Sequence, residues 1–304
     1  MHQSVLYCRR RAGVIVTNVR QVWPEGALLG EGTVWIEEEQ ALYWVNIKGK
    51  SVHRYHPDSE DRQSWDVPEE IGTLIPRTSG GFVAGLLSGL YFIDLASGEL
   101  EALGGPETNT PGNRINDGKA DDLGRIWLGT MDNAETEPTG ALYRIDADGS
   151  QHVMDSDYVI TNGPAFSPDG RTLYHTDTLK KTIFAYDLAA DGSLANKREH
   201  IVIADHQGWP DGMTTDADGY LWVAHFGGWR ITRFDPDGAV DRVIDMPVGQ
   251  ITNVAFGGPD LEVLYVTSAA KQLDAGALAK QPLAGALFEI PVGIKGRLPG
   301  RYAG

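Results

Sequence analysis

One pattern recurs six times along this 304-residue chain, and it constrains the fold more than any other feature of the sequence. Each copy joins an aromatic-rich segment to a second alternating segment, as in ALYWVNI followed by SVHRYHP and GYLWVAH followed by RITRFDP. The copies start at positions 41, 80, 124, 171, 219 and 262, a spacing typical of four-stranded propeller blades. The sequence therefore predicts an all-β fold, a six-bladed β-propeller with four-stranded blades.

The segments between these copies agree with hairpin connections. Asp-Gly turns such as SPDG, DADG and DPDG supply residues that adopt positive φ at hairpin spacing. Helical periodicity is nearly absent, and the one helix-like stretch, residues 273–287, is limited by Pro282. No linker or change of composition marks a boundary, so we expect a single domain over residues 1–304. We expect the first blade to be closed by a strand from the opposite end of the chain, with residues 19–25 and 296–304 as the two candidates.

Composition narrows the classes of function. The formal net charge of −16 disfavours nucleic acid, because a polyanion would be repelled. A lone cysteine, Cys8, rules out an intramolecular disulfide framework. The N-terminal basic cluster follows a very short apolar run, which is the wrong order for a secretory signal, and no run approaches the ~18 apolar residues of a membrane span. We expect a cytoplasmic protein, a monomer or weak homo-oligomer, without nucleic-acid or membrane partners.

An oxygen-bearing side chain stands at the same place in most copies, shortly before the aromatic segment. In a propeller such matched positions lie on the innermost strands and face one another across the axis. Glu31 interrupts an apolar stretch, where a carboxylate is costly to bury unless it is paired or ligated. Asp-Gly and Asn-Gly pairs in isolation are usually turns, but their recurrence here favours a site for Ca²⁺, Mg²⁺ or Mn²⁺ over one for Zn²⁺. The six matched residues are Glu31, Ile71, Asn116, Asn162, Asp211 and Asn253.

Charged and aromatic neighbours of these positions suggest a substrate pocket. Arg114 and Asn116 are two residues apart, so on a strand they share a face while Asp117 faces away. A planar guanidinium at this place suits an anionic or hydroxyl-rich substrate, although a surface arginine paired with an aspartate is the alternative. For Trp209, packing against other side chains and a place at the mouth of the pocket are equally favoured. For His225, a structural role is favoured.

The phrases around these residues resemble the gluconolactonase, senescence-marker-protein and luciferin-regenerating-enzyme family, the relatives of regucalcin. They include LGEGTVW, NRINDGKAD, TNGPAFSPDGRTLY and WPDGMTTDADGYLWVA, and the resemblance spans residues 29–293. It implies a six-bladed propeller with one divalent metal in its channel and an enzyme that opens sugar lactones. It also implies site residues: Glu31, Asn162 and Asp211 as metal ligands, Asp211 as the base, and Arg114 and Asn116 as substrate contacts. The ligand set does not distinguish Ca, Mg, Mn, Zn and Fe(II).

One segment departs from the family pattern. Animal relatives carry a substrate-contacting Glu a few residues after a GTM phrase, whereas this chain has Ala134 at that spacing. We expect Asp132 or Asn133 to serve instead, or the pocket to prefer a different sugar. Two other functions fit the same scaffold. One is a metal-dependent phosphotriesterase with a more apolar pocket, and the other is a propeller that binds Ca²⁺ without catalysis.

Overall fold

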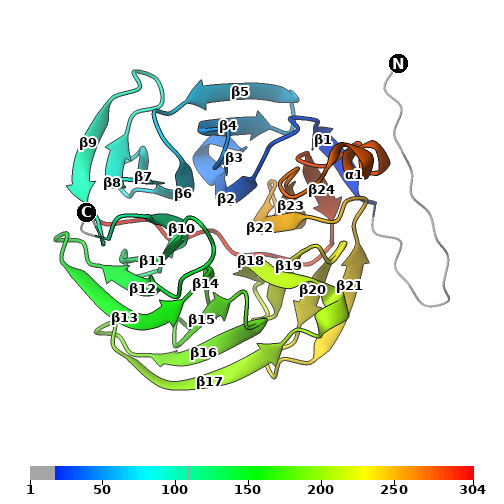
Figure 1. The fold of residues 1–304 in the computed structure, drawn as a ribbon. Helices are drawn as coiled ribbons and strands as arrows, with labels where there is room; N and C mark the ends of the chain where they lie inside the picture. The colour runs from blue at the N-terminus through cyan, green and yellow to red at the C-terminus, as the bar shows by residue number, and fades with distance from the viewer. Residues whose placement is uncertain (1–17, 108–109) are drawn as a thin grey trace.

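The computed structural model describes residues 18–107 and 110–304, and within these ranges it consists of six four-stranded antiparallel sheets. The sheets are arranged like blades around a central axis (Figure 1). This confirms the predicted propeller. No helix in the described ranges is long and apolar enough to cross a membrane. The basic N-terminal cluster and Cys8, from which the cytoplasmic location is predicted, lie outside the described residues.

Each of the first five blades is built from strands that run outward from the axis in chain order. The first three blades are β2 (Gly30–Ile36), β3 (Ala41–Asn46), β4 (Ser51–His56) and β5 (Asp61–Asp66); β6 (Ile71–Pro76), β7 (Phe82–Leu86), β8 (Gly89–Ile93) and β9 (Leu100–Gly104); and β10 (Asn113–Ala120), β11 (Ile126–Asp132), β12 (Gly140–Ile145) and β13 (Gln151–Tyr158). The next two are β14 (Thr161–Phe166), β15 (Thr172–Asp177), β16 (Thr182–Leu188) and β17 (Leu194–Val202); and β18 (Trp209–Thr215), β19 (Leu221–Phe226), β20 (Arg230–Phe234) and β21 (Val240–Asp245).

The sixth blade combines both ends of the chain. Its inner strands are β22 (Ile251–Gly257), β23 (Val263–Ser268) and β24 (Leu287–Pro291), and β1 (Arg20–Trp23) pairs antiparallel with β24 at the outer edge. An ion pair of 2.7 Å between Arg20 Nε and Glu289 Oε1 supports this register. The expectation that the first blade is closed by the far end of the chain is therefore wrong. The first blade is one contiguous meander, and the N-terminal candidate, residues 19–25, closes the last blade.

The other candidate, the C-terminal segment, lies across the ends of several blades. Residues 293–304, here called the C-terminal strap, form isolated bridges to the second, third and fifth blades. Figure 1 shows this red segment crossing the ring from the last blade. The bridges join Gly296 to Asp216, Gly300 to Ala120 and Tyr302 to Arg77. The strap therefore fastens separate blades to one another instead of adding a strand to any of them.

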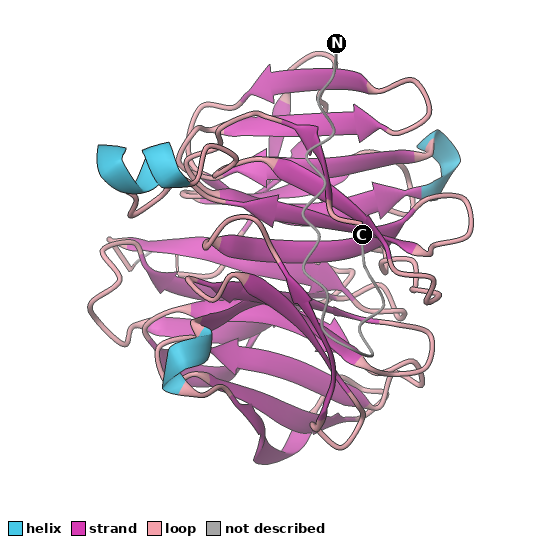
Figure 2. Ribbon diagram, turned by 90° about the vertical axis from the view of Figure 1, so that its right-hand side faces the viewer, coloured by secondary structure: helices cyan, strands magenta, loops and turns pink. Residues whose placement is uncertain are grey.

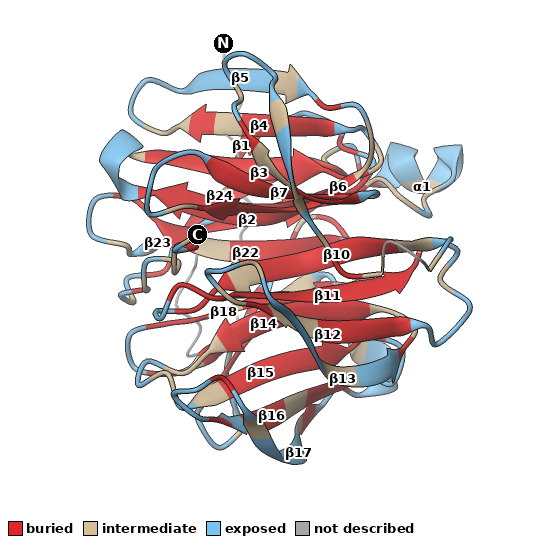
Figure 3. Cartoon of the chain, turned by 90° about the vertical axis from the view of Figure 1, so that its left-hand side faces the viewer, coloured by how far each residue is buried: buried red, intermediate tan, exposed pale blue. Residues whose placement is uncertain are grey.

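Burial follows distance from the axis. All seven residues of β2 are buried, whereas the outermost strand of the same blade, β5, is mostly exposed. Figure 3 shows the same gradient in the third blade, from a buried β10 to an exposed β13. Large aromatic residues fill the space between neighbouring sheets, and Trp35, Trp44, Trp127 and Trp222 are fully buried. Facing sheets thus share a core, as the aromatic segment of each repeat predicts.

Helical structure is confined to short pieces in the connections (Figure 2). The α-helix α1 spans Ala275–Lys280, inside the predicted stretch 273–287 but much shorter. Asp274 is its N-cap and accepts a hydrogen bond of 2.8 Å from the backbone N–H of Ala277. Two 3₁₀ turns, Glu37–Glu39 and Asp205–Gln207, complete the helical content of the described residues.

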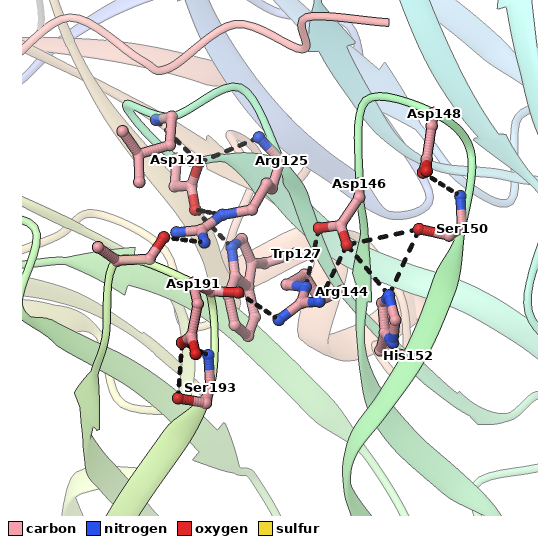
Figure 4. A network of polar contacts seen from close by, with 12 residues as sticks. Asp121, Arg125, Trp127, Arg144, Asp146, Asp148, Ser150, His152, Asp191 and Ser193 are labelled. Atoms are coloured by element: carbon pink, nitrogen blue, oxygen red, sulfur yellow. Dashed lines mark hydrogen bonds and ion pairs between the residues drawn. The ribbon is translucent and has the colours of Figure 1, made fainter.

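A buried aspartate, Asp121, holds the turn between the first two strands of the third blade through hydrogen bonds (Figure 4). Asp121 Oδ1 accepts hydrogen bonds of 3.0 Å from the backbone N–H groups of Leu123 and Arg125. Its Oδ2 accepts from the Arg125 guanidinium at 2.7 Å and from the Trp127 indole at 2.8 Å. One carboxylate thereby accepts hydrogen bonds from the backbone of the turn, from a buried guanidinium and from a buried indole.

The fifth blade repeats this arrangement. Asp216 Oδ1 accepts from the backbone N–H groups of Asp218 and Tyr220 at 3.0 Å. Its Oδ2 accepts from the Trp222 indole at 2.9 Å and from Arg233 Nε at 2.8 Å. Asp121 and Asp216 are called the turn aspartates below.

Candidate active site in the channel

The innermost strand of every blade loses its regular register at or beside the matched position. Such irregularities, β-bulges among them, bend a strand and redirect its side chains, and they are common beside active sites. They lie between Glu31 and Val34, Ile71 and Thr73, Ile115 and Gly118, Asn162 and Ala165, Pro210 and Met213, and Ile251 and Val254. The repeat therefore places six distorted strand segments around one axis.

A cavity of about 170 Å³ lies where these segments meet. Glu31, Arg114, Asn116, Asn162 and Asp211 all line it. The five residues come from the inner strands of the first, third, fourth and fifth blades. The structure thus brings together residues that are up to 180 positions apart in the sequence.

Glu31 is held in place by its own strand and by the sixth blade. Its Oε2 accepts hydrogen bonds from Asn253 Nδ2 at 3.0 Å and from the Gly32 N–H at 3.2 Å. Asn253 is itself oriented, because its Oδ1 accepts from the Thr33 hydroxyl at 2.7 Å. Burial, followed by the nearby carboxylate of Asp117, raises the pKa of Glu31 to about 8. Asn253, to which the sequence assigned no role, therefore fixes a predicted ligand.

Asp211 lies in the same buried space and is only 6% exposed. Its pKa is raised well above the usual range, first by burial and then by the negative charges of Glu31 and Asp117. The next residue must be small, because a Cβ at Gly212 would lie 2.3 Å from Asn253 Nδ2. The glycine that follows Asp211 is therefore explained by crowding at the axis, where neighbouring inner strands approach closely.

The amide of Asn162 has a defined orientation. The Thr178 hydroxyl donates its single proton to the Pro210 carbonyl at 3.1 Å, so its oxygen must accept from Asn162 Nδ2 at 2.9 Å. The carbonyl oxygen of Asn162 consequently points the other way, where Asn116 Nδ2 lies at 3.1 Å. Asn162 therefore presents an oxygen, not an amide nitrogen, on the side of Asn116. Thr178 also lines the cavity, although no motif in the sequence pointed to it.

Arg114 is buried and anchored on two sides. Its Nη1 donates to Asn116 Oδ1 at 2.6 Å and its Nε donates to Asn133 Oδ1 at 3.0 Å. Asn133 also accepts from Lys48 Nζ at 2.8 Å, and Lys48 in turn pairs with Glu70 at 2.8 Å. The structure thus places Asn133 behind Arg114, outside the set of residues that line the cavity.

Asp132 is the last residue of β11, and its carboxylate binds the backbone of the loop that follows. It accepts hydrogen bonds from the backbone N–H groups of Ala134, Thr136 and Glu137, which hold its pKa below the usual range. Asp132 does not line the cavity. The predicted substrate contact by Asp132 or Asn133 stays a prediction, and this geometry does not favour it. Glu135 of the same loop does reach the cavity, one position beyond the alanine that replaces the family's glutamate.

Asp117 faces the channel, contrary to the prediction from strand alternation. Its Oδ2 accepts from the Gly163 N–H at 3.1 Å and lies 3.5 Å from Asn253 Nδ2. The prediction fails because the register shifts between Ile115 and Gly118, which interrupts the alternation of faces. A third buried carboxylate therefore lies beside Glu31 and Asp211, and burial raises its pKa.

The structure favours a place at the pocket mouth for Trp209 and a structural role for His225. Trp209 lines the cavity and is 39% exposed, with Lys181 Nζ 4.9 Å from the centre of its ring, so the pocket-mouth interpretation holds. His225 is buried outside the cavity, and its Nδ1 is 3.0 Å from the Gln207 carbonyl oxygen. Burial lowers the pKa of His225 to about 4. Its structural interpretation is the one that the geometry favours.

The donor set suits a hard divalent cation. Within residues 18–107 and 110–304 no three His, Cys, Asp or Glu side chains form a group that could hold a metal. The donor set consists of the carboxylates of Glu31 and Asp211 and the oriented amide oxygen of Asn162, which all line the cavity. Burial and neighbouring carboxylates raise the pKa values of Glu31 and Asp211, and a positive charge between the two residues would offset both effects. Oxygen donors of this kind bind Ca²⁺, Mg²⁺ or Mn²⁺.

The fold and the cavity define a six-bladed propeller with an acidic, oxygen-lined channel site. Residues 29–270 match the family described as the SMP-30/Gluconolactonase/LRE-like region, and the chain belongs to this family. It is 39% identical to the 6-deoxy-6-sulfogluconolactonase of Pseudomonas putida over 280 residues, which cover 91% of this chain and 96% of the relative. It is 37% identical to regucalcin of Danio rerio over 284 residues, which cover 91% and 95%.

The solved structures agree with the fold. A luciferin-regenerating enzyme superposes with a TM-score of 0.89 at 33% sequence identity, covering 94% of this chain and 99% of the other. The similarity therefore extends over the whole propeller, and the family includes sugar lactonases.

Proposed function

We propose that this protein hydrolyses a sugar lactone, an aldonolactone of pentono or hexono type, to the open-chain aldonic acid with the help of one divalent cation. The observation that carries the proposal is the convergence of two buried carboxylates with raised pKa values, an oriented amide oxygen and a buried guanidinium on one cavity. The name of the Pseudomonas putida relative points to the same reaction class.

Glu31, Asn162 and Asp211 are the residues that would hold the cation. When bound, the cation supplies Lewis acidity toward the lactone carbonyl and toward water. Asn253 and Thr178 keep two of the three donors in place, because one donates to Glu31 and the other accepts from Asn162. Outer residues of this kind set the orientation of metal ligands.

Arg114 orients the substrate in this proposal. Its Nε and Nη1 are engaged by Asn133 and Asn116, so the plane of the guanidinium is fixed where it borders the cavity. A fixed planar donor suits ring hydroxyls and the negative charge that develops on the carbonyl oxygen. Trp209 adds an aromatic face at the mouth, suited to the apolar face of a sugar ring.

Asp211 is our candidate for the general base. A bound cation would offset the burial and the two like charges that raise the pKa of Asp211, so the carboxylate would be ionised and able to accept a proton from water whose acidity the cation raises. In the proposed reaction Asp211 takes a proton from the attacking water and returns it to the ring oxygen, which leaves as a hydroxyl when its bond to the carbonyl carbon breaks. Asp211→Asn should retain less than about 1% of the turnover, since positioned acid–base groups contribute about 10²–10⁴-fold. Full ring opening by a cation-loaded Asp211→Asn variant would remove Asp211 from this role.

Two alternatives use the same scaffold. A phosphotriesterase pocket should be more apolar and should lack the pair formed by Arg114 and Asn116, yet both residues line this cavity. A calcium-binding propeller without catalysis would have no use for a guanidinium fixed beside the cation site. Both features favour the lactonase.

The direct test is pH-stat titration of a panel of xylono-, arabinono-, glucono- and galactonolactone, with the spontaneous ring opening of each subtracted. Chelated protein and protein reloaded with Ca²⁺, Mg²⁺, Mn²⁺, Zn²⁺ or Fe²⁺ are compared on each substrate. We expect acid release above background for at least one lactone, only in the reloaded samples. Turnover of a phosphotriester without turnover of any lactone would replace this proposal with the phosphotriesterase.

A further inference from the structure

The cavity contains a lysine for which the proposed reaction has no use. Lys271 lines the cavity together with Arg114 and the cation site. It follows β23 of the sixth blade, and its backbone N–H donates to the Leu28 carbonyl at 2.9 Å. The preceding residue, Ala270, donates to the Ala27 carbonyl at 3.0 Å. Two hydrogen bonds to the loop before the first blade therefore fix the point from which the lysine side chain projects.

The side chain of Lys271 forms an ion pair with Glu135. Glu135 lies in the loop after β11 of the third blade, and both residues line the cavity. In a ring of six blades the third and the sixth are opposite, so the pair spans the mouth of the channel. The side chains are 24% and 22% exposed, which places the pair at the boundary between cavity and solvent.

The two cations of the cavity are held differently. The guanidinium of Arg114 is buried and is bonded to two asparagines, so it is part of the fixed frame. Among the residues that the structure describes, the Lys271 ammonium pairs with the partly exposed Glu135 carboxylate alone, which a competing anion can displace at little cost. Once Glu31 and Asp211 are assigned to the cation site, Arg114, Lys271 and Glu135 leave a net positive charge in the rest of the cavity.

We propose that Lys271 is a specificity-determining residue that selects lactones carrying an anionic, oxygen-bearing substituent, such as a sulfonate or a phosphate, at the end of the sugar remote from the carbonyl. This rests on the proposed function. The carbonyl belongs at the deep end, beside the cation site and Arg114, so the remote carbon projects toward the mouth and Lys271. The substituent takes the place of the Glu135 carboxylate, and the Glu135 side chain turns out to solvent.

The test compares glucono-1,5-lactone with its 6-phosphate and 6-sulfonate derivatives for wild type and Lys271→Met. We expect the wild-type kcat/KM to be at least about tenfold higher on one or both anionic lactones, mainly through KM, because charge-assisted hydrogen bonds strengthen binding. Lys271→Met should lower the ratio of anionic to neutral kcat/KM by about 10–100-fold, and Lys271→Arg should recover part of it. An unchanged ratio in Lys271→Met, or a wild type that prefers the neutral lactone, overturns the inference.

Two further variants make the comparison specific. Lys280→Met removes the same charge from the exposed end of α1, outside the cavity, and should leave the anionic-to-neutral ratio within about twofold of wild type. Glu135→Gln removes the competing carboxylate and should raise the ratio several-fold. A lower ratio in Glu135→Gln would show that the ion pair, not the free lysine, recognises the substrate, and would contradict the inference.

A binding measurement separates this inference from the proposed function. Calorimetric titration with the open-chain 6-sulfonate acid and with gluconate needs no turnover. Preferential binding of the sulfonate acid that is lost in Lys271→Met, with no lactone opened, would support the anion site and defeat the lactonase. Opening of lactones, with equal binding of the sulfonate acid and gluconate, would support the lactonase and contradict the anion site.

Discussion

Two groups of buried carboxylates in this propeller, one in the turns and one in the channel, have sharply different surroundings. In the turns, Asp121 and Asp216 each accept two backbone hydrogen bonds, an indole hydrogen bond and an arginine contact. In the channel, Glu31 and Asp211 lie beside each other and beside Asp117, and repulsion adds to burial in raising their pKa values. The chain supplies a cation for each turn aspartate but leaves the channel carboxylates to share an excess of negative charge.

The comparison separates carboxylates that stabilise the fold from carboxylates that are placed to bind a ligand. A buried charge that is paired and fully hydrogen-bonded stabilises its surroundings, and its removal leaves the partner unpaired. A buried charge without a partner costs stability until a cation binds. The same residue type therefore has opposite effects on stability in the two regions.

The largest expected effect is on catalysis. Glu31→Gln keeps the shape of the side chain but removes a charge from the cation site, so turnover of the best lactone should fall at least about 10³-fold. Initial rates in the pH-stat measure this. Glu37→Gln, which alters an exposed glutamate in the same part of the chain, is the matched control and should keep wild-type rates. Equal rates in the two variants would remove Glu31 from the site.

The opposite pattern is expected for a turn aspartate. Asp216→Ala removes the acceptor of the Trp222 indole and one of the two carboxylates that bind the Arg233 guanidinium, the other being Asp241. The free energy of unfolding should fall by about 3–5 kcal/mol, measured by urea denaturation, while the activity per folded molecule changes little. If stability were preserved and activity lost, the division between the two regions would break down.

The channel carboxylates also predict a pH dependence of stability. The folded pKa of Glu31, about 8, lies above its unfolded value near 4.3, so the folded state binds more protons between these values. The free energy of unfolding of the chelated protein should therefore fall as pH rises from about 5 to 8. Relative to Glu31→Gln, the wild type should lose about 1–3 kcal/mol over this range, and saturating cation should cancel the loss. Parallel pH profiles for wild type and Glu31→Gln would contradict this explanation.

The smallest effect is expected at an orienting residue. Thr178→Val preserves the shape of the side chain but removes the acceptor that holds the Asn162 amide. Affinity for the cation should weaken about 10–100-fold, as for other residues that orient metal ligands. Calorimetry measures the affinity, and urea denaturation serves as the control, with a loss below about 1.5 kcal/mol expected. Unaltered cation affinity would show that Asn162 needs no such support.

The sequence predicts this fold well because the repeat encodes it. Each blade has its own aromatic segment, and five of the six have a polar residue at the matched position, so Glu31, Asn162 and Asp211 could be found by comparing copies. The orientation of Asp117 could not be predicted, since it depends on a local register shift that the residue pattern does not reveal.

Residues outside the repeat were also missed. Thr178 and Lys271 reach the cavity from connections between strands, whose paths depend on contacts with other blades. Closure of the ring was ambiguous for a similar reason. Both terminal segments contain strand-like residues, and only three-dimensional proximity shows that β1 completes the last blade while the C-terminal strap bridges several others.

The most direct test of the cation site is a calorimetric titration of the chelated protein with a divalent cation, with lactone turnover measured in samples of the same composition. We predict one cation bound per chain, turnover that rises in proportion to occupancy, and loss of both in Glu31→Gln. Full turnover by the chelated protein, or unchanged cation binding in Glu31→Gln, would contradict the proposal that the channel carboxylates hold a catalytic metal.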